Sequence, residues 1–323
     1  MRVLFLPYDP EYHYYWYNGF VEALDDRFPL EMFDPDKPMA PQFKGIGVVV
    51  TCSQFDNGMI DAGLKAGVKL WQVLSVGIDH WDVPYILKKG MPFANTPGPF
   101  SAIALAEHAL SLMFLIAKNH NTSQANMRAE FFSLPLNDEL AGKKLGIIGL
   151  GASGRELAKR AHALGMEIMA IDVADIPQSV RDEHHVSFFG GASEMAHVIA
   201  QADYLSLHTP NTAETRHMIG KEQFELMKSS AVLINVARGL LVDEEALVEA
   251  LQSGQIRGAG LDAFAVEPLS SSHPLLQMDN VYCTPHVAGV TRETAQRRGE
   301  AAANNVDRVS KGLEPLHLIT SVD

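Results

Sequence analysis

One stretch of the chain, residues 144–172, restricts its possible folds more than any other. It begins with an apolar run, KLGIIGL, that is typical of a buried β-strand. A glycine loop, GLGASG at 149–154, follows and opens a helical pattern, and a second apolar run then ends in Asp172. Strand, glycine turn, helix and strand in this order predict a βαβ unit with parallel strands.

The same alternation of short apolar runs and helical patterns continues along most of the chain. We expect further strands at 3–7, 45–50, 68–74, 204–208, 231–236, 258–264 and 280–286. Two prolines and a glycine in TPGPFS (96–101) interrupt the first series, and a long apolar helix is expected at 102–117. The sequence therefore predicts an α/β fold with two domains, each built on a parallel sheet.

The composition disfavours several classes of protein. A net charge of −13 is opposite to the sign that a nucleic-acid surface or an anionic membrane attracts. The two cysteines, Cys52 and Cys283, make no disulfide framework, and neither HExxH nor a paired-cysteine metal motif is present. The first residues do not resemble a signal peptide, and the apolar helix at 102–117 is shorter than a bilayer span. We therefore expect a cytoplasmic protein with no metal, nucleic-acid or membrane partner.

The glycine loop matches the pattern G-x-G-x-x-G in the context that dinucleotide binding requires. Gly149 allows the tight turn, Gly151 lets the backbone approach a pyrophosphate at the positive end of the helix, and Gly154 lets the helix pack on the strand. Asp172 can accept hydrogen bonds from ribose hydroxyls and would repel a 2′-phosphate, which favours NAD over NADP. The alternative is a tight turn that binds no dinucleotide.

Three polar residues are expected at or just past the ends of three successive strands. These are Arg238, Glu267 and His286, and ligands of open α/β sheets bind at the carboxyl ends of the strands. A guanidinium can hold a carboxylate through two hydrogen bonds, and a glutamate beside a histidine raises the histidine pKa, which suits proton exchange near neutral pH. The alternatives are an arginine that ties down a loop and a Cys283–His286 dyad. The dyad is disfavoured because residues three apart in a strand point to opposite faces.

These motifs together resemble the D-isomer-specific 2-hydroxyacid dehydrogenases, a group of NAD-dependent enzymes. The resemblance covers nearly the whole chain and rests on SVGIDHWDV (75–83), NTPGPFSAIALAEHAL (95–110), GKKLGIIGLGASG (142–154), LHTPNTAETRHMI (207–219), INVARGLLVDEEAL (234–247), GAGLDAFAVEP (258–268) and TPHVAG (284–289).

The resemblance implies an NAD(H)-dependent D-2-hydroxyacid dehydrogenase or 2-oxoacid reductase that acts on a small 2-hydroxy or 2-oxo acid. Arg238 would bind the carboxylate and carbonyl oxygen of the substrate, and His286 would exchange the hydroxyl proton. Glu267 would tune and orient His286, and a hydride would move between C2 of the substrate and the nicotinamide ring. Backbone N–H groups of Val76 and Gly77 would hold the substrate carboxylate.

The resemblance also implies a cofactor site, two domains and a dimer. Asp262 would face the nicotinamide carboxamide. The full set of residues expected at the cofactor is Gly149, Gly151, Ala152, Ser153, Gly154, Asp172, Thr209, Pro210, Val236, Ala237, Asp262 and Gly289. A discontinuous substrate domain (1–98 plus 290–323) and an NAD-binding domain (99–289) would each have a Rossmann-like or flavodoxin-like fold. A homodimer would form through the cofactor domain.

The sequence departs from this family at two places. Ala152 and Ser153 stand where relatives often have Arg or Asn and then Ile, which weakens the contacts to pyrophosphate, although the Ser153 hydroxyl can still donate a hydrogen bond. Thr51, Cys52 and Ser53 follow the strand at 45–50, where phosphoglycerate dehydrogenases typically carry an arginine for the substrate phosphate. This second departure disfavours 3-phosphoglycerate as the substrate.

An aromatic segment, YDPEYHYYWYNG at 8–19, follows the first expected strand and should leave from the ligand-binding end of its sheet. We expect it to form a loop that contacts the substrate, which would favour one bulkier than glyoxylate. The alternative is a structural cluster within the substrate domain or a subunit contact.

Other activities are consistent with the same residue types. Phosphite dehydrogenase uses the same Arg, Glu and His, and the C-terminal-binding-protein corepressors share the fold but act largely by binding partners. Formate dehydrogenases pair the histidine with a glutamine, so Glu267 disfavours them.

Overall fold

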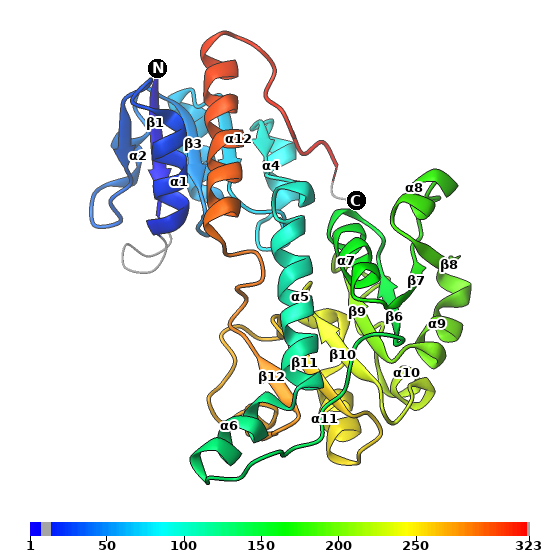
Figure 1. Ribbon diagram of the computed structural model, residues 1–323. Coiled ribbons are helices and arrows are strands. Elements are labelled where there is room, and N and C mark those ends of the chain that lie inside the picture. Colours follow the sequence, from blue (N-terminus) through cyan, green and yellow to red (C-terminus); the bar gives the residue numbers. More distant parts are fainter. Residues whose placement is uncertain (8–13, 322–323) are drawn as a thin grey trace. The chain divides into compact units, whose positions relative to one another are not determined.

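The computed structural model describes residues 1–7 and 14–321. The chain divides into two compact units, which we call unit 1 (Met1–Phe100 and Val290–Asp323) and unit 2 (Ser101–Gly289). Each unit contains one sheet in which every pair of neighbouring strands is parallel (Figure 1). The predicted α/β class with two parallel sheets is confirmed.

Unit 1 has a five-stranded sheet in the order β2-β1-β3-β4-β5, the order of flavodoxin-like folds. Its strands are β1 (Arg2–Leu6), β2 (Leu30–Met32), β3 (Ile46–Thr51), β4 (Leu70–Val73) and β5 (Phe93–Ala94). Its helices are α1 (Tyr14–Leu24), α2 (Met39–Gln42), α3 (Asn57–Ala66), α4 (Val83–Lys89) and α12 (Arg292–Ser310).

Alternate residues of these strands are buried on opposite faces of the sheet. In β1, Val3 and Phe5 pack in one cluster with residues of α1 and α12, whereas Leu4 and Leu6 pack in a second cluster with residues of α3 and α4. Both faces are therefore covered by helices, which explains why the strands are nearly continuous apolar runs. Figure 1 shows α1 and α12 side by side against one face.

Unit 2 has a seven-stranded sheet in the order β12-β11-β10-β9-β6-β7-β8. Its strands are β6 (Lys144–Ile148), β7 (Glu167–Ile171), β8 (Val186–Gly190), β9 (Tyr204–Leu207), β10 (Val232–Asn235), β11 (Gly258–Leu261) and β12 (Val281–Cys283). Its helices are α5 (Ala102–Ala117), α6 (His120–Arg128), α7 (Ala152–Ala163), α8 (Gln178–Glu183), α9 (Met195–Gln201), α10 (Lys221–Leu226) and α11 (Glu244–Gln252). The order reverses between β6 and β9, as in dinucleotide-binding Rossmann folds, and such a reversal creates a crevice at the carboxyl ends of the two strands.

Some sequence-based boundaries are wrong. The strand expected at 280–286 ends at Cys283, because the amide of Thr284 makes the last bond to Leu261 and Pro285 has no N–H to continue the ladder. The strand expected at 258–264 ends at Leu261, so Asp262 follows the strand instead of lying in it. Strands β2, β5 and β8 were not predicted, since the first two are very short and the third lies at a half-buried edge.

The described part of the aromatic segment, residues 14–19, is helical and not the loop that we expected. Residues from Tyr14 onward form α1, because an apolar face formed by Trp16, Phe20 and Leu24 packs against the sheet and α12. The remaining part, including Tyr8, Tyr12 and His13, lies outside the described residues.

The predicted helix at 102–117 is confirmed as α5, and nine of its residues are buried. Among the described residues no single helix is long and apolar enough to cross a membrane. Helices α5 and α6 meet that length and composition only as a pair, with a bend of 51° at the break between them.

The C-terminal helix α12 is anchored to unit 1 by a buried polar contact. The Asn305 side chain, 1 % exposed, donates to Gln72 Oε1 at 2.7 Å and to the Leu316 carbonyl at 2.9 Å. Its Oδ1 accepts from the Leu316 amide at 2.7 Å. Gln72 is fully buried in β4, so this contact fixes both the helix and the segment that follows it.

We predict that Asn305→Ala destabilises the protein, because it leaves the Gln72 carbonyl and the Leu316 groups without their partner. The expected loss is about 1–3 kcal/mol of unfolding free energy, measured by urea denaturation. The matched control is Asn304→Ala, the exposed neighbour on the same helix, which should have little effect. Equal midpoints for the two variants would contradict this role of Asn305.

Candidate active site

The Glu267 and His286 side chains form a hydrogen-bonded pair in unit 2. His286 Nδ1 lies 2.8 Å from Glu267 Oε2, and Glu267 Oε1 accepts from the Phe264 amide at 3.0 Å. The imidazole is 40 % exposed, so the pair has one side open to solvent or a ligand. Because Nδ1 faces the carboxylate, Nε2 is the nitrogen left to exchange a proton with another molecule.

The electrostatics of the pair favour a charged imidazole. The hydrogen bond that His286 donates to Glu267 raises the pKa of the histidine; burial lowers it, and the negative charge of Glu267 raises it further. Burial disfavours the ionised form of Glu267, but hydrogen bonds from His286 and the Phe264 amide outweigh this and lower the Glu267 pKa. This arrangement favours the protonated form of His286 over that of a free histidine, which suits a group that exchanges protons.

Arg238 lies close enough to influence both partners. Its positive charge lowers the pKa of His286 and that of Glu267. The half-buried Arg238 directly follows the turn after β10, and its Nη1 donates to the Ala237 carbonyl at 2.8 Å. The structure therefore brings together the three residues that the sequence singled out.

Two local features position Arg238. Asn235, at the end of β10, accepts from the Ala237 amide at 3.1 Å and donates to the Arg238 carbonyl at 2.9 Å, which closes the turn. A Cβ on Gly239 would lie 1.8 Å from the Phe264 carbonyl carbon, so only glycine allows this turn to pack against the segment that leads to Glu267.

The backbone at His286 is unusual and is held by a buried carboxylate. His286 has φ +54, a left-handed conformation that is uncommon for residues other than glycine. Asp262, which has no exposed surface, accepts from the Val287 amide at 2.8 Å, the Ala288 amide at 2.7 Å and the Thr284 hydroxyl at 2.6 Å. These three bonds fix the chain on both sides of His286.

A histidine on α5 extends this network. His108 Nε2 lies 2.8 Å from the Thr284 hydroxyl, whose own hydrogen is donated to Asp262. His108 Nε2 is therefore the donor to Thr284. Burial lowers the His108 pKa, with Asp262 acting in the opposite direction. His108, Thr284 and Asn235 were not predicted from the sequence, although Thr284 and Asn235 lie at strand ends close to predicted site residues.

The glycine loop has the geometry that a dinucleotide pyrophosphate needs. A Cβ on Gly154 would lie 2.1 Å from the Gly149 carbonyl oxygen, so α7 begins in direct contact with the loop. A Cβ on Gly151 would meet no atom within 4 Å, so the space beside Gly151 is open. The first amides of α7, those of Ala152, Ser153 and Gly154, have no preceding carbonyl to bond within the helix and can bind an anion. The described residues therefore fit a bound dinucleotide.

The other residues expected at the cofactor lie at the same end of the sheet. Asp172 directly follows β7, and its carboxylate accepts from the Leu150 amide of the glycine loop at 2.7 Å. Thr209 and Pro210 come shortly after β9, a neighbour of β6.

Val236, Ala237 and Gly289 complete this set. The Val236 and Ala237 side chains, after β10, are buried in the two cores of unit 2, and the Ala237 amide and carbonyl bond to Asn235 and Arg238. Gly289 is the last residue of unit 2 and follows Ala288, whose amide bonds to Asp262.

Val76 and Gly77 belong to unit 1, in the loop that follows β4. The Val76 carbonyl accepts from the Asn95 side chain at 2.8 Å, and the Gly77 carbonyl accepts from the Ser75 hydroxyl at 2.9 Å. The carbonyls of this loop are thus engaged within unit 1, and its amides are the groups that can donate to a ligand.

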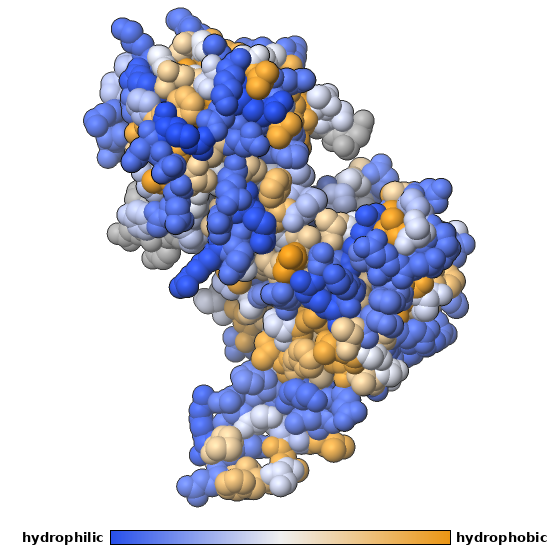
Figure 2. Space-filling view, turned by 45° about the horizontal axis from the view of Figure 1, so that its top comes forward, coloured by the Kyte–Doolittle hydropathy of each residue, from blue (hydrophilic) through white to orange (hydrophobic). Residues whose placement is uncertain are grey.

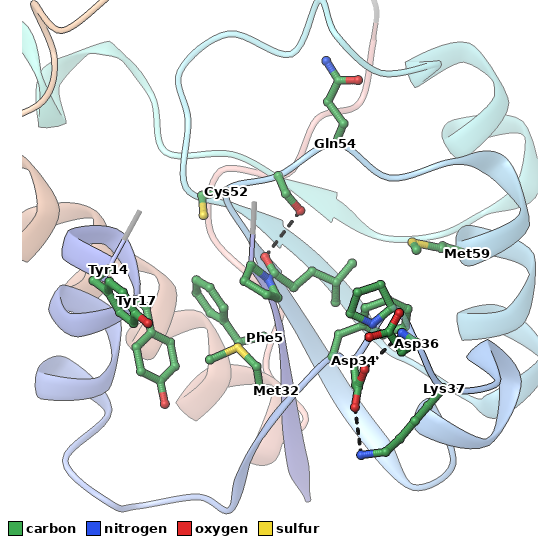
Figure 3. A pocket seen from close by; sticks show the side chains of 15 residues that line it. Phe5, Tyr14, Tyr17, Met32, Asp34, Asp36, Lys37, Cys52, Gln54 and Met59 are labelled. Carbon is green, nitrogen blue, oxygen red and sulfur yellow. Dashed lines mark hydrogen bonds and ion pairs between the residues drawn. The ribbon is translucent and has the colours of Figure 1, made fainter. Parts of the chain in front are cut away.

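Unit 1 contains a pocket of about 740 Å³ at the carboxyl ends of β1, β2 and β3 (Figure 3). Tyr14 and Tyr17 of α1 lie on one side of it, and Asp34, Asp36 and Lys37 lie on another. The other lining residues are Phe5, Leu6, Pro7, Met32, Phe33, Pro35, Cys52, Ser53, Gln54 and Met59. Lys37 is paired with Asp34 at 2.9 Å, so the charged lining is net negative.

The aromatic segment thus has two roles in the structure. Tyr14 and Tyr17 line the pocket, as the ligand hypothesis expects. Trp16 is 7 % exposed and packs in the core of unit 1 beneath the Arg298 guanidinium, which lies 4.6 Å from the ring centre. Trp16 therefore belongs to a structural cluster within unit 1 and not to the pocket.

A thiol nucleophile at Cys283 is disfavoured, because burial raises the pKa of this thiol to about 11. Among residues 1–7 and 14–321, no group of three or more His, Cys, Asp or Glu side chains is arranged to hold a metal ion.

We predict that Glu267→Gln lowers the pKa of His286, because the amide keeps a hydrogen-bonding oxygen but removes the negative charge. The measurement is an NMR titration of the imidazole resonances. Glu245→Gln, an exposed glutamate on α11, is the control and should leave the His286 titration unchanged. An unchanged titration in Glu267→Gln would show that the carboxylate does not set the charge of the histidine.

Comparison with known proteins gives a consistent result. The family model described as "D-isomer specific 2-hydroxyacid dehydrogenase, NAD binding domain" matches residues 110–288. The D-3-phosphoglycerate dehydrogenase of Methanocaldococcus jannaschii is 41 % identical over 239 residues, which are 73 % of this chain but only 44 % of the relative. The chain thus spans less than half the length of that relative. The glyoxylate reductase of Korarchaeum cryptofilum is 35 % identical over 313 residues, which are 93 % of this chain and 92 % of the relative.

Solved structures agree with these sequence matches. The NAD-complexed D-isomer specific 2-hydroxyacid dehydrogenase of Lactobacillus delbrueckii ssp. bulgaricus superposes with a TM-score of 0.83. It is 26 % identical, and the match covers 99 % of this chain and 100 % of that one.

Proposed function

Because the chain belongs to the D-isomer specific 2-hydroxyacid dehydrogenase family, we propose that it interconverts a D-2-hydroxy acid and the corresponding 2-oxo acid with NAD(H). The observation that carries this proposal is the hydrogen-bonded Glu267–His286 pair beside Arg238, at the strand ends of a unit whose glycine loop fits a dinucleotide.

In this proposal each of the three residues has one task. The Arg238 guanidinium binds the carboxylate and carbonyl oxygen of the 2-oxo acid and polarises the carbonyl. His286 gives a proton from Nε2 to the carbonyl oxygen during reduction and takes it back from the hydroxyl during oxidation. Glu267 keeps the imidazole oriented and raises its pKa. Bound NADH supplies the hydride.

Val76, Gly77 and Asp172 complete the proposed site. The amides of Val76 and Gly77 hold the substrate carboxylate, since the loop carbonyls are engaged elsewhere. The Asp172 carboxylate lies against the glycine loop, where it accepts hydrogen bonds from ribose hydroxyls and disfavours the 2′-phosphate of NADP.

The pocket in unit 1 supports a substrate with an uncharged side chain larger than that of glyoxylate. Strand β3 lies next to β4, so Cys52 and Ser53 at the pocket follow the strand neighbouring the one that leads to Val76 and Gly77. The aromatic and apolar lining of the pocket suits an apolar substrate group. The net negative charge of the same lining would repel a phosphate.

We predict NADH oxidation with 2-oxo acids, followed at 340 nm across glyoxylate, hydroxypyruvate, pyruvate, phenylpyruvate and 3-phosphohydroxypyruvate. His286→Ala should lower kcat at least about 100-fold, because the general acid is lost. NADPH should be used less well than NADH, and the phosphorylated acid less well than hydroxypyruvate.

Two further results distinguish a wrong substrate pocket from a wrong activity. Tyr17→Ala should raise the KM of the larger acids but not that of glyoxylate, and equal KM changes would reject the pocket as a substrate site. No turnover with any acid despite NADH binding would reject the reductase and favour phosphite oxidation or a regulatory role.

We also propose that unit 2 forms the interface of a homodimer. Its segment 127–136 exposes a series of apolar side chains beside α6, at the lower end of the view in Figure 2. These are Met127, Phe131, Phe132, Leu134 and Leu136, with exposed fractions of 64 %, 59 %, 81 %, 62 % and 93 %. The segment is held to α6 by the bond from the Phe131 amide to the Asn126 carbonyl, 2.9 Å, and to the break before α6 by the bond from Asn119 Nδ2 to the Leu136 carbonyl, 3.0 Å. An exposed apolar group on a fixed segment suits a second copy of the chain.

We predict that Phe132→Asp combined with Leu136→Asp gives a monomer, because it places two charges in the apolar contact. The mass in solution is measured by analytical ultracentrifugation. Leu226→Asp, an exposed leucine elsewhere in unit 2, should leave the native mass unchanged. A native protein that is monomeric at all concentrations would refute the dimer.

A further inference from the structure

A histidine outside the proposed catalytic group lies beside the glycine loop. His208 directly follows β9, and its amide donates to the Ile148 carbonyl at the end of β6 at 2.8 Å. Strands β6 and β9 are the pair between which the strand order reverses. His208 therefore lies at the crevice where this type of sheet binds the phosphates of a dinucleotide.

The imidazole connects two serines through its two nitrogens. Ser206 Oγ lies 2.9 Å from His208 Nε2, and His208 Nδ1 lies 2.9 Å from Ser153 Oγ. Ser206 is fully buried in β9, whereas Ser153 is the second residue of α7, in the first turn after the glycine loop. The three side chains link the interior of the sheet to the phosphate-binding turn.

The direction of these hydrogen bonds follows from the chemistry of the groups. Burial lowers the pKa of His208 to about 4, so the imidazole is neutral at neutral pH and has one donor and one acceptor nitrogen. Within the described chain, the buried Ser206 hydroxyl has His208 Nε2 as its hydrogen-bond partner, so its hydrogen is donated there. Nε2 is then the acceptor, and Nδ1 carries the proton that is donated to Ser153 Oγ.

This direction has a consequence for Ser153. Its oxygen accepts from His208, so its own hydrogen is not used in that bond and can be donated to another group. The first-turn amides of α7 and the open space beside Gly151 mark where an anion would lie. The Ser153 hydroxyl can therefore add a side-chain donor to the backbone donors of this turn.

We propose that His208 is a positioning residue that directs the Ser153 hydroxyl hydrogen toward the pyrophosphate of the bound dinucleotide. Ser153 binds the phosphate, and His208, supported by Ser206, sets the orientation of the serine. This inference rests on the proposed NAD(H) function. It gives Ser153 a specific role in GLGASG, a loop that contains no basic residue.

The test is the binding of NADH, followed by fluorescence, and of ADP and adenosine, followed by competition with NADH. Ser153→Ala should weaken NADH and ADP about tenfold, the effect of one hydrogen bond to a charged group, and leave adenosine unchanged. His208→Leu should produce a similar loss. His208→Asn, whose amide can replace the Nδ1 donor, should retain more affinity than His208→Leu.

The double variant Ser153→Ala/His208→Leu tests the coupling. It should bind NADH no more weakly than Ser153→Ala alone, because both changes remove the same interaction. Ser187→Ala, a serine on β8 whose hydroxyl donates to the Ile168 carbonyl, is the matched control and should bind all three ligands normally.

Three results would overturn the proposal. Native affinity for NADH and ADP in Ser153→Ala would show that the hydroxyl does not reach the phosphates. An equal loss for adenosine in that variant would show a structural role for the pair. If the native protein binds neither NADH nor ADP, the proposed function fails as well, and this outcome is distinct from the first two.

Discussion

The buried carboxylate of Asp262 is the interaction on which the candidate active site depends. It accepts three hydrogen bonds from the segment that surrounds His286, and it has no contact with solvent. The ladder between β11 and β12 stops before Pro285, so these bonds replace it and allow His286 its left-handed backbone. Glu267 can then bond to Nδ1 of His286, which leaves Nε2 available for proton exchange. Asp262 thus positions the Glu267–His286 pair indirectly, through its bonds to the Val287 and Ala288 amides and to the Thr284 hydroxyl.

A second constraint is the reversal of strand order between β6 and β9 in unit 2. Because β7, β6 and β9 are parallel neighbours, the glycine loop, Asp172 and His208 all lie at the same end of the sheet, and the reversal opens a crevice between β6 and β9. The open space beside Gly151 and the amides of α7 form the proposed anion site. The Ser153 hydroxyl adds to it only because β9 places His208 beside α7. In this proposal, neutral hydroxyl and amide donors of the loop and of α7 bind the phosphates.

In unit 1, the residues that follow strand β3 bond within the protein and line a pocket. Thr51 and Ser53 are buried, their hydroxyls lie 3.0 Å apart, and the Thr51 hydroxyl donates to the Leu6 carbonyl of β1 at 3.2 Å. The neighbouring pocket combines tyrosine rings with a paired lysine and two aspartates. This lining is the chemical reason why we separate the proposed substrate from that of the phosphoglycerate dehydrogenase relative, despite 41 % identity over the matched region.

The sequence by itself determined the α/β class, the parallel sheets, the βαβ unit with its glycine loop, and the identity of Arg238, Glu267 and His286 as neighbours. These features follow from local patterns, namely apolar periodicity, glycine spacing and the rule that parallel strands end at one edge. Tertiary structure alone decided that Trp16 is a core residue while Tyr14 and Tyr17 line a pocket, because a helical face is selected by what packs against it. It also decided the contacts of His108 with Thr284, of His208 with Ser153 and of Asn305 with Gln72. Each of these joins residues from separate elements, and no local pattern in a single sequence records which side chains will meet.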